Sequence, residues 1–439
     1  MKHARHVPRR PRSHLHKRQL VLKAQPAAAP RPLRIAITNV YGGGDYTAQL
    51  LVGKLQKPAN LILDTGSSTL AVKPQVYNPG QDQDVTVTSQ AQIVQYGTGG
   101  WAGPVVETMV TFNSVSLPKA FVAVADVQEP DNFGQADGIL GLAYNIMNSA
   151  YNLKALLQQK GSASTNTYPW PFKVKGTEAA LEELENEWAG QPQADIDPYF
   201  TALEEKNVVA NKLAFYTLRS FPRVSAANAS LATLAQDKLN QGFLIVGGGE
   251  EQTDLYNGTF SVVTVVDDLY YNVNLRSVQV GNGPVVAAAS LQPAFTQDAG
   301  SNAIVDSGTN SLVLAGDVYA AIVNALEKLN PKFAQMFASG QSENGVATAD
   351  LKLDSWPNIS FVLQGAPGDV TLTVAPSTYW QVDCPAPGRA LLAVSGMPSN
   401  AQTPNQSIFG LPLMNNYYTV FDRSAGTKGV IRFAPIKVS

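Results

Sequence analysis

The amino-acid sequence predicts a mostly β protein whose two halves are related by a pseudo-twofold axis. Two observations support this fold class. Short apolar runs alternate with turns rich in glycine, asparagine and aspartate along most of the 439 residues, which is typical of β proteins. A twelve-residue pattern also occurs twice, as LILDTGSSTLAV at 61–72 and as AIVDSGTNSLVL at 303–314. Two copies of one pattern indicate two similar halves.

The first half of the chain contains six predicted strands. Each is a short apolar or alternating run that is bounded by turn residues. The runs are RIAITNV (34–40), YTAQLLVG (46–53), ANLILD (59–64), DVTVTS (84–89), VVETMVTF (105–112) and AFVAVADV (120–127). They predict a β lobe over residues 35–210.

A stretch with helical periodicity interrupts this lobe at about 145–196. In the run TEAALEELENEW, Thr177 can act as the N-cap, and the apolar residues Leu181, Leu184 and Trp188 repeat at helical spacing. The pair Asp197-Pro198 then predicts the start of another short helix, with Asp197 as its cap. We interpret 145–196 as an insertion, either a surface excursion or a lid that modifies the site or a partner surface.

The second lobe is predicted over residues 211–439. Its strands are expected at 213–219, 243–247, 260–266, 270–280, 359–363, 370–374, 390–394 and 417–422. One helix is expected in DVYAAIVNALEKL at 317–329, with Asp317 as its N-cap.

A basic segment of residues 1–34 precedes both lobes. It holds ten of the 32 lysines and arginines and no acidic residue, so 22 basic and 34 acidic residues remain, a net charge of −12 for the rest of the chain. The segment is a disordered arm, a targeting arm or a pro-segment held on the acidic body by charge. It does not indicate nucleic-acid binding, because no basic stripe or aromatic platform accompanies it.

Histidine and cysteine are almost missing from the two lobes. All four histidines lie in the first sixteen residues, and Cys384 is the only cysteine. A Ser-His-Asp triad, a Cys-His pair and a zinc site all need residues that the lobes lack. We therefore expect no metal, no cofactor and no internal disulfide, and acid–base chemistry performed by carboxylates, lysine or tyrosine.

The apolar segments of the chain also bear on its location. No run approaches the roughly 18 apolar residues of a membrane span, so no membrane association is expected. No secretory signal is visible, because the run Leu20-Val21-Leu22 ends at Lys23. We expect a cytoplasmic protein, or a secreted or periplasmic one if the true start lies elsewhere.

The repeated pattern predicts a site with two carboxylates. In register, it aligns Asp64 with Asp306 and Gly66 with Gly308, with hydroxyls at the pairs Thr65/Ser307 and Ser67/Thr309. Two carboxyl groups about 3 Å apart cannot both be ionised, so they share one proton. The ionised group can take a proton from water while the protonated one polarises a carbonyl. The alternative, two unrelated turns, requires a coincidence of two motifs.

At these residues the sequence resembles the pepsin-like aspartic proteases, from about residue 35 onward. The matching segments are Asp64–Ser68 and Asp306–Thr309 for the two catalytic motifs, Tyr96–Trp101 for the flap hairpin, Ala136–Ala143 and Ile408–Gly410 for the segments that support the loops, and YYTVFDR at 417–423. The chain lacks the usual disulfides of the family, and in this respect it is similar to disulfide-free members known from bacteria.

The resemblance implies a bilobal acid protease fold with the active-site cleft between the lobes. It implies a monomeric endopeptidase that acts on polypeptides at acidic pH, prefers hydrophobic residues around the scissile bond and is inhibited by pepstatin. The implied catalytic residues are Asp64 and Asp306. Thr65 and Ser307 would lock the loops together, Gly66 and Gly308 would shape them, Ser67 and Thr309 would bind the outer carboxylate oxygens, and Tyr96, Gly97 and Thr98 would form the flap over the substrate.

Two departures from the family pattern keep an alternative open. Ala71 stands where the family has a tryptophan that steadies the flap tyrosine, although Trp101 could replace it, and Leu411 stands where an acid is common. Ala71 and the insertion leave a catalytically silent binding or inhibitor protein as the alternative. A half-sized dimeric protease of retroviral type is excluded, because one chain carries both motifs.

Overall fold

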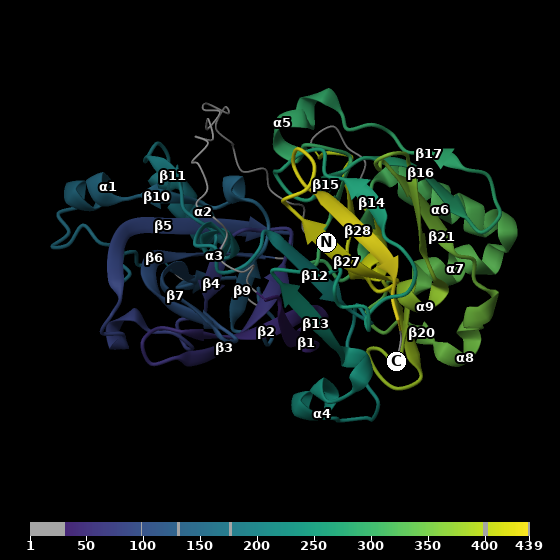
Figure 1. The fold of residues 1–439 in the computed structure, drawn as a ribbon, viewed down its shortest axis with the longest axis horizontal. Coiled ribbons are helices and arrows are strands. Elements are labelled where there is room, and N and C mark those ends of the chain that lie inside the picture. Colours follow the sequence, from purple (N-terminus) through teal and green to yellow (C-terminus); the bar gives the residue numbers. More distant parts are fainter. Residues whose placement is uncertain (1–30, 98, 130–131, 175–177, 398–402, 438–439) are drawn as a thin grey trace.

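The computed structural model describes residues 31–97, 99–129, 132–174, 178–397 and 403–437. These residues form the predicted mostly β fold with two lobes (Figure 1). The purple and blue part of the chain lies on one side, and the green part lies on the other. Thr98, Thr177 and the basic segment up to residue 30 lie outside the described residues.

The first part of the chain contains the six predicted strands, most of them longer than expected. Its strands are β1 (Leu33–Gly42), β2 (Asp45–Val52), β3 (Lys57–Asp64), β4 (Leu70–Val72), β5 (Thr86–Tyr96), β6 (Gly99–Phe112), β7 (Val115–Val124), β8 (Val127–Gln128), β9 (Gly138–Gly141), β10 (Ser149–Asn152) and β11 (Gln193–Asp195). Its helices are α1 (Lys154–Gln159), α2 (Glu178–Trp188) and α3 (Tyr199–Glu205).

The second part contains the remaining elements. Its strands are β12 (Lys212–Tyr216), β13 (Gln241–Val246), β14 (Ser261–Thr264), β15 (Asn272–Val273), β16 (Leu275–Val280), β17 (Val286–Ala287), β18 (Ala303–Val305), β19 (Leu312–Leu314), β20 (Val346–Ala347), β21 (Ile359–Leu363), β22 (Val370–Val374), β23 (Trp380–Val382), β24 (Arg389–Leu392), β25 (Val394–Gly396), β26 (Ser407–Phe409), β27 (Tyr417–Asp422) and β28 (Val430–Pro435). Its helices are α4 (Leu231–Ala235), α5 (Thr296–Ala299), α6 (Gly316–Leu329), α7 (Pro331–Ser339), α8 (Thr348–Leu351), α9 (Pro376–Tyr379) and α10 (Leu411–Met414).

The same strand arrangement surrounds both copies of the repeated pattern. In the first lobe, β9 pairs in parallel with β3 and antiparallel with β4. In the second lobe, β26 pairs in parallel with β18 and antiparallel with β19. The loop from β3 to β4 carries Asp64 and the loop from β18 to β19 carries Asp306, so each aspartate leaves its sheet in the same way.

A continuous sheet joins the lobes. Strand β1 pairs antiparallel with β13, from Leu33 opposite Val246 to Thr38 opposite Gln241. The sheet then continues through β12, β27, β28 and β14, so strands from both ends of the chain lie side by side. In β1, Ile35 and Ile37 alternate into the core, as expected for a strand with one buried face.

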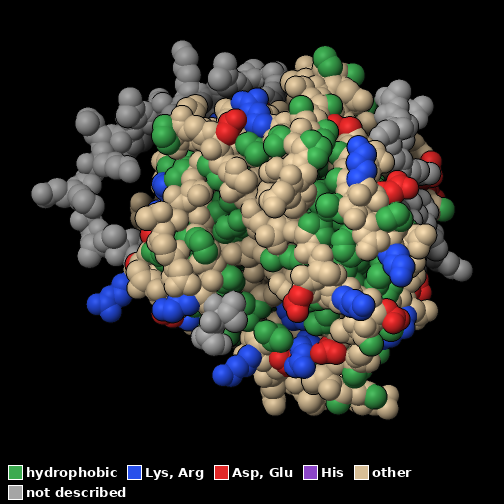
Figure 2. Space-filling model, turned by 90° about the vertical axis from the view of Figure 1, so that its right-hand side faces the viewer, with side chains coloured by type: hydrophobic (Ala, Val, Ile, Leu, Met, Phe, Trp, Pro, Cys, Tyr) green, Lys and Arg blue, Asp and Glu red, His purple; other side chains and the backbone are tan. Residues whose placement is uncertain are grey.

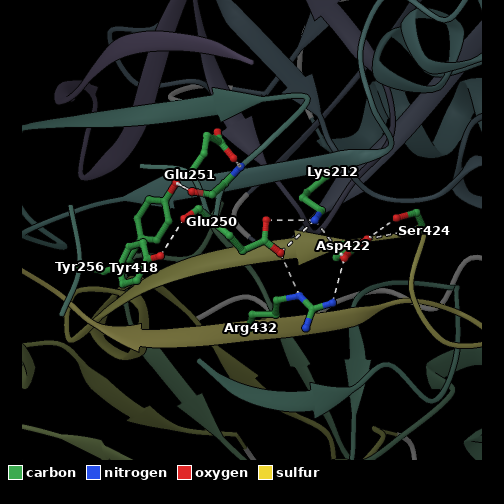
Figure 3. A network of polar contacts seen from close by, with 9 residues as sticks. Lys212, Glu250, Glu251, Tyr256, Tyr418, Asp422, Ser424 and Arg432 are labelled. Carbon is green, nitrogen blue, oxygen red and sulfur yellow. Dashed lines mark hydrogen bonds and ion pairs between the residues drawn. The ribbon is translucent and has the colours of Figure 1, made fainter. Parts of the chain in front are cut away.

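A buried polar network lies on this joining sheet (Figure 3). Asp422, at the end of β27, is 4% exposed and receives Lys212 Nζ at 3.3 Å and Arg432 Nη2 at 3.1 Å. Glu250 contacts the same two cations, with Lys212 Nζ at 2.9 Å and Arg432 Nε at 3.1 Å. Burial acts to raise the pKa of Asp422, but hydrogen bonds from Ser424 and Arg432 and the charge of Lys212 outweigh it and hold that pKa below its usual range.

Three predicted helices are present, but two of the predicted caps are wrong. The helix expected at 317–329 is α6, which buries Val318, Ile322 and Leu326 on one face. Its N-cap is Ala315, and Asp317 instead accepts a hydrogen bond from the Ala289 amide at 2.9 Å. The N-cap of α3 is Pro198 and no side chain caps it, because the helix begins one residue later than Asp197-Pro198 predicted.

The insertion forms a compact part of the first lobe. It contributes α2 and adds β10 and β11 to the edge of the sheet, where β10 pairs with β5. Helix α2 buries Leu181, Leu184 and Trp188, the three residues that its predicted periodicity selected.

On the face of the second lobe shown in Figure 2, charged side chains of both signs are scattered among hydrophobic ones. No helix in the described part of the chain has both the length and the apolar character needed to cross a bilayer.

Candidate active site

The two aspartates of the repeated pattern lie together at the ends of equivalent strands. Asp64 is the last residue of β3, and Asp306 follows β18 directly. Their side chains are almost completely buried, with residue exposures of 5% and 7%. The apolar strands before them place the carboxyl groups in the interior, so their charges lie in a poorly solvated environment.

Each carboxyl group lies against the glycine of the opposite loop. A Cβ added to Gly66 would stand 2.8 Å from the carboxylate oxygens of Asp306. A Cβ added to Gly308 would stand 2.3 Å from Oδ1 of Asp64. Both contacts are shorter than any real Cβ contact, so a residue with a side chain would separate the loops. This packing explains why glycine occupies both positions.

The hydrogen bonds to the two aspartates follow the same pattern. The Gly66 amide donates to Asp64 Oδ1 at 2.7 Å, and Ser67 Oγ donates to Asp64 Oδ2. In the second loop, the Gly308 amide donates to Asp306 Oδ1 at 2.9 Å, and Thr309 Oγ1 donates to Asp306 Oδ2 at 2.6 Å. Each carboxylate is thereby held by its own loop, with one oxygen on an amide and the other on a hydroxyl.

A second set of bonds crosses between the loops. Thr65 Oγ1 accepts from the Ser307 amide at 2.8 Å and donates to the Val305 carbonyl at 3.2 Å. Ser307 Oγ accepts from the Thr65 amide at 3.0 Å and donates to the Leu63 carbonyl at 2.8 Å. Both hydroxyls are buried, so these bonds fix the position of one loop relative to the other.

The electrostatics of the pair favour a shared proton. Burial, followed by the neighbouring charge of Asp306, holds the pKa of Asp64 well above its usual range. A hydrogen bond with Asp306 acts in the same direction, whereas those from Ser67 and Gly66 oppose it. A proton placed between the two groups removes the repulsion of two adjacent negative charges. The arrangement therefore offers one acid and one base in the same site.

A third carboxyl group, Asp45, faces the pair and was missed from the sequence. It begins β2, directly after Gly42–Gly44. Burial, followed by the charges of Asp306 and Asp64, raises its pKa well above the usual value. Its Oδ1 atom is buried and has no hydrogen-bond partner among the described residues. Nothing in the run YGGGDY distinguishes this aspartate from one in a solvent-exposed turn.

The candidate flap is the turn between β5 and β6. Tyr96 ends β5 opposite Gly99, and Gly97 lies in the turn between them. Burial raises the pKa of Tyr96, the hydrogen bond from Trp101 opposes this, and the charge of Asp64 adds to it. The effect of Asp64 indicates that Tyr96 faces the dyad.

Trp101 connects the flap to the loop of Asp64. Its indole is completely buried, and Nε1 donates to the Tyr96 hydroxyl at 3.2 Å. Tyr96 also forms a hydrogen bond with Ser67, which donates to Asp64. Trp101 and Ala71 belong to the same buried apolar cluster. In this chain the indole donor to Tyr96 therefore comes from β6, whereas position 71 carries an alanine.

Backbone segments behind the loops complete the site. In the first lobe, the amides of Leu142 and Ala143 donate to the carbonyls of Asp64 and Ser67 at 2.6 and 2.7 Å. In the second lobe, the Leu411 amide donates to the Thr309 carbonyl at 2.8 Å. Leu411 is buried and begins α10, so its apolar side chain belongs to the core. Within the described ranges, no cluster of three or more His, Cys, Asp or Glu residues is arranged to hold a metal ion.

Comparisons with known proteins agree on one family. The family described as eukaryotic aspartyl protease matches residues 45–168 and 201–435. The chain is 22% identical to gastricsin of Mus musculus over 89% of its length and 81% of the relative. It is 25% identical to pepsin-2B of Gadus morhua, over 89% and 96% of the two chains. It is 22% identical to vacuolar protease A of Neurospora crassa, over 94% and 84%.

Proposed function

Since the chain belongs to the eukaryotic aspartyl protease family and is an aspartic endopeptidase by that membership, we propose that it hydrolyses peptide bonds with a water molecule held between Asp64 and Asp306. The observation that supports this mechanism best is the reciprocal packing of the two loops, in which each glycine lies against the opposite carboxylate. Such packing brings two carboxyl groups close enough to act on one water molecule.

The proposed reaction needs one proton on the pair. The ionised carboxylate takes a proton from water as the water oxygen bonds to the scissile carbonyl carbon, and the protonated carboxyl group donates to the carbonyl oxygen. The carboxyl group that took the water proton then donates it to the amide nitrogen, while the other carboxylate takes a proton from a hydroxyl of the resulting diol. The C–N bond breaks in this step, and a carboxylic acid and an amine are released. No covalent intermediate with the enzyme forms, and the pair returns to its state with one proton.

The state with one proton sets the proposed pH range. As pH rises, the shared proton is lost and both carboxyl groups become ionised, so no group remains to polarise the carbonyl. As pH falls far enough, both become protonated and no base remains. The raised pKa of Asp64 supports a working range in mildly acidic solution.

Substrate is proposed to bind as an extended strand beneath Tyr96. Main-chain hydrogen bonds would hold the polypeptide, while alternate side chains enter apolar pockets on either side of the dyad. We propose a preference for hydrophobic residues around the scissile bond. The enzyme is further proposed to act as a monomer and, since the described part of the chain has no disulfide, in the cytoplasm.

Digestion of denatured haemoglobin or casein at pH 3 to 5, with and without pepstatin, tests the function. Asp64→Ala and Asp306→Asn should each lower turnover by at least about 10⁴-fold while circular dichroism stays native, because each change removes the acid–base pair. Full activity in either variant would contradict the mechanism. No cleavage by the natural chain across this range would favour a catalytically silent binding or inhibitor protein, the alternative that Ala71 and the insertion suggest.

The basic segment is proposed to be a removable pro-segment that pairs with the acidic body near neutral pH. Acidification protonates carboxylates and weakens such pairs. N-terminal sequencing after incubation near pH 4 should then show cleavage around residues 18–35. An active enzyme with an intact N-terminus would reject this role.

A further inference from the structure

The two faces of the candidate flap have different neighbours. Side chains alternate between the faces of a strand, and β5 pairs with β6 so that Gln95 lies opposite Gly100. Trp101 belongs to a buried apolar cluster that also contains Ala71, and Tyr96 packs against this cluster. Gln95 and Gly100 therefore lie on the opposite, outer face of the hairpin.

Helix α2 covers this outer face. It lies between residues 169 and 200, the part of the chain that the family match leaves out. Gln95 Nε2 donates to Glu185 Oε1 at 2.8 Å. Leu181 Cδ1 lies 2.8 Å from the position of a Cβ added to Gly100, so α2 rests directly on the backbone of β6. Figure 1 shows α2 beside β5 and β6.

An apolar cluster anchors α2 along the hairpin. Its members from α2 are Ala180, Leu181, Leu184 and Trp188, and its members from the hairpin are Ala91, Ile93 and Ala102. Leu181, Leu184 and Trp188 are each at most 1% exposed. Strand β10 adds main-chain pairing to the same hairpin, with Tyr151 opposite Ala91. The insertion thus contacts the hairpin from its base to the residue before Tyr96.

We infer that α2 positions the flap, and that Leu181 and Glu185 are positioning residues that hold Tyr96 over the dyad. An isolated two-stranded hairpin is only marginally stable, and packing against a helix gives it a fixed geometry. Glu185 contacts Gln95, the residue before Tyr96, and Leu181 contacts Gly100, which lies opposite Gln95. Their contacts are therefore transmitted to the Tyr96 hydroxyl through one or two backbone units. The inference rests on the proposed function, because a positioned flap affects turnover only where peptide is cleaved beneath it.

Kinetics and hydrogen exchange on four variants of the full chain test this role. Leu181→Ala removes the packing on Gly100, and Gln95→Ala removes only the hydrogen bond to Glu185, so it remains informative if Leu181→Ala does not fold. Leu326→Ala in α6 is the control for a buried leucine lost far from the flap, and Glu183→Ala is the control for an exposed position on α2. The measurements are kcat and KM on a peptide substrate, pepstatin affinity, melting temperature, and exchange in peptides covering residues 90–102.

We expect Leu181→Ala to lower kcat/KM by about 10- to 100-fold, since small displacements of positioning groups have effects of this size. Gln95→Ala should produce a smaller loss, and both should weaken pepstatin binding and speed exchange over residues 90–102. Leu326→Ala should lower the melting temperature with kcat/KM within about twofold, and Glu183→Ala should change neither. Equal kinetic losses in Leu181→Ala and Leu326→Ala, or unchanged exchange at the flap in folded Leu181→Ala, would overturn the inference. If the natural chain proves inactive, the proposed function fails, whereas exchange still reports whether α2 holds the hairpin.

Discussion

At the scale of single residues, the site contains more carboxyl groups than the proposed reaction uses. The dyad and its hydroxyl partners account for the proposed shared proton, yet Asp45 adds a third, partly buried carboxyl group that the proposed reaction does not use. Ionising a carboxyl group in such surroundings is unfavourable, because water is replaced by a poorly polarisable interior and two like charges lie nearby. Neutral pH should therefore destabilise the folded protein through this group.

The variant Asp45→Asn tests this cost. Because the folded-state pKa of Asp45 is raised, its contribution to stability is complete below the unfolded carboxyl pKa of about 3.9 and is lost as pH rises through the folded value. The asparagine mimics the neutral form, so the melting temperature should rise by roughly 1–3 °C at pH 7 and change little at pH 3.5. Differential scanning fluorimetry at both pH values measures the shift, and its short scans limit self-digestion.

The control for this experiment is Asp354→Asn, which also removes a carboxyl group but does so at an exposed position. A shift for Asp45→Asn that is the same at pH 3.5 and pH 7 would contradict the assignment of a buried, raised carboxyl group.

At the scale of elements, the flap hairpin is held on two faces by different means. Trp101 fixes the hydroxyl of Tyr96 from within, and α2 packs on the outer face. The indole hydrogen bond has a directional role, because it leaves the hydroxyl of Tyr96 to meet Ser67 and, through it, Asp64.

Removing the indole donor should lower activity without loosening the core. Trp101→Phe keeps an aromatic ring in the buried cluster but cannot donate to Tyr96. We therefore expect kcat/KM to fall by roughly 3- to 10-fold, which corresponds to the loss of one hydrogen bond of about 1 kcal/mol. In a background with Tyr96→Phe the same change should have almost no further kinetic effect, because the acceptor is already missing. An equal loss in both backgrounds would assign the effect of Trp101 to packing alone.

At the scale of the whole molecule, the joining sheet must survive in the acidic range where the dyad is proposed to work. Asp422 links β12, β27 and β28 through Lys212 and Arg432, and its pKa is lowered. The stabilisation from a lowered carboxyl pKa is present above the unfolded value and is lost as pH falls through the folded value. Asp422 therefore stays charged in mildly acidic solution, in which ordinary carboxylates begin to protonate.

Asp422→Asn should destabilise the chain by about 2–4 kcal/mol at pH 7, because it removes the more deeply buried of the two carboxylates that Lys212 and Arg432 share. The loss should shrink as pH falls below the folded pKa, where the natural side chain is itself neutral. Urea unfolding at pH 7, 4 and 2.5 measures both effects. Asp254→Asn breaks the exposed pair with Arg34 and should cost at most about 1 kcal/mol. If both variants lost the same free energy of unfolding, the network would contribute no more stability than an ordinary surface ion pair.

The parts of the fold that could be predicted are those determined by residues close together in the sequence. Apolar runs predicted the strands, and the spacing of Leu181, Leu184 and Trp188 predicted α2. The repeated pattern brought Asp64 and Asp306 to attention because the residues around each aspartate are its own hydrogen-bond partners.

The features that were missed depend on contacts between distant segments. Asp45 is distinguished only by its neighbours, and the role of Gln95 and Gly100 becomes visible only when α2 is seen on them. The predicted caps were wrong because the N-cap of α3 lies one residue after Asp197 and that of α6 lies two residues before Asp317, whose side chain instead accepts from the Ala289 amide. Strand β28 was missed as well, although it completes the joining sheet beside β27.

The joining sheet also has a consequence for the order in which the chain is synthesised. Leu33 pairs with Val246, so β1 is made more than 200 residues before its partner β13. At about 5–20 residues per second, the ribosome needs roughly 10 to 40 s to supply that partner. During this interval an emerging first lobe would display the unpaired edge of β1, and open strand edges invite association with other chains. Translation speed and early chaperone contact should therefore affect the yield of this protein more than that of one whose lobes close independently.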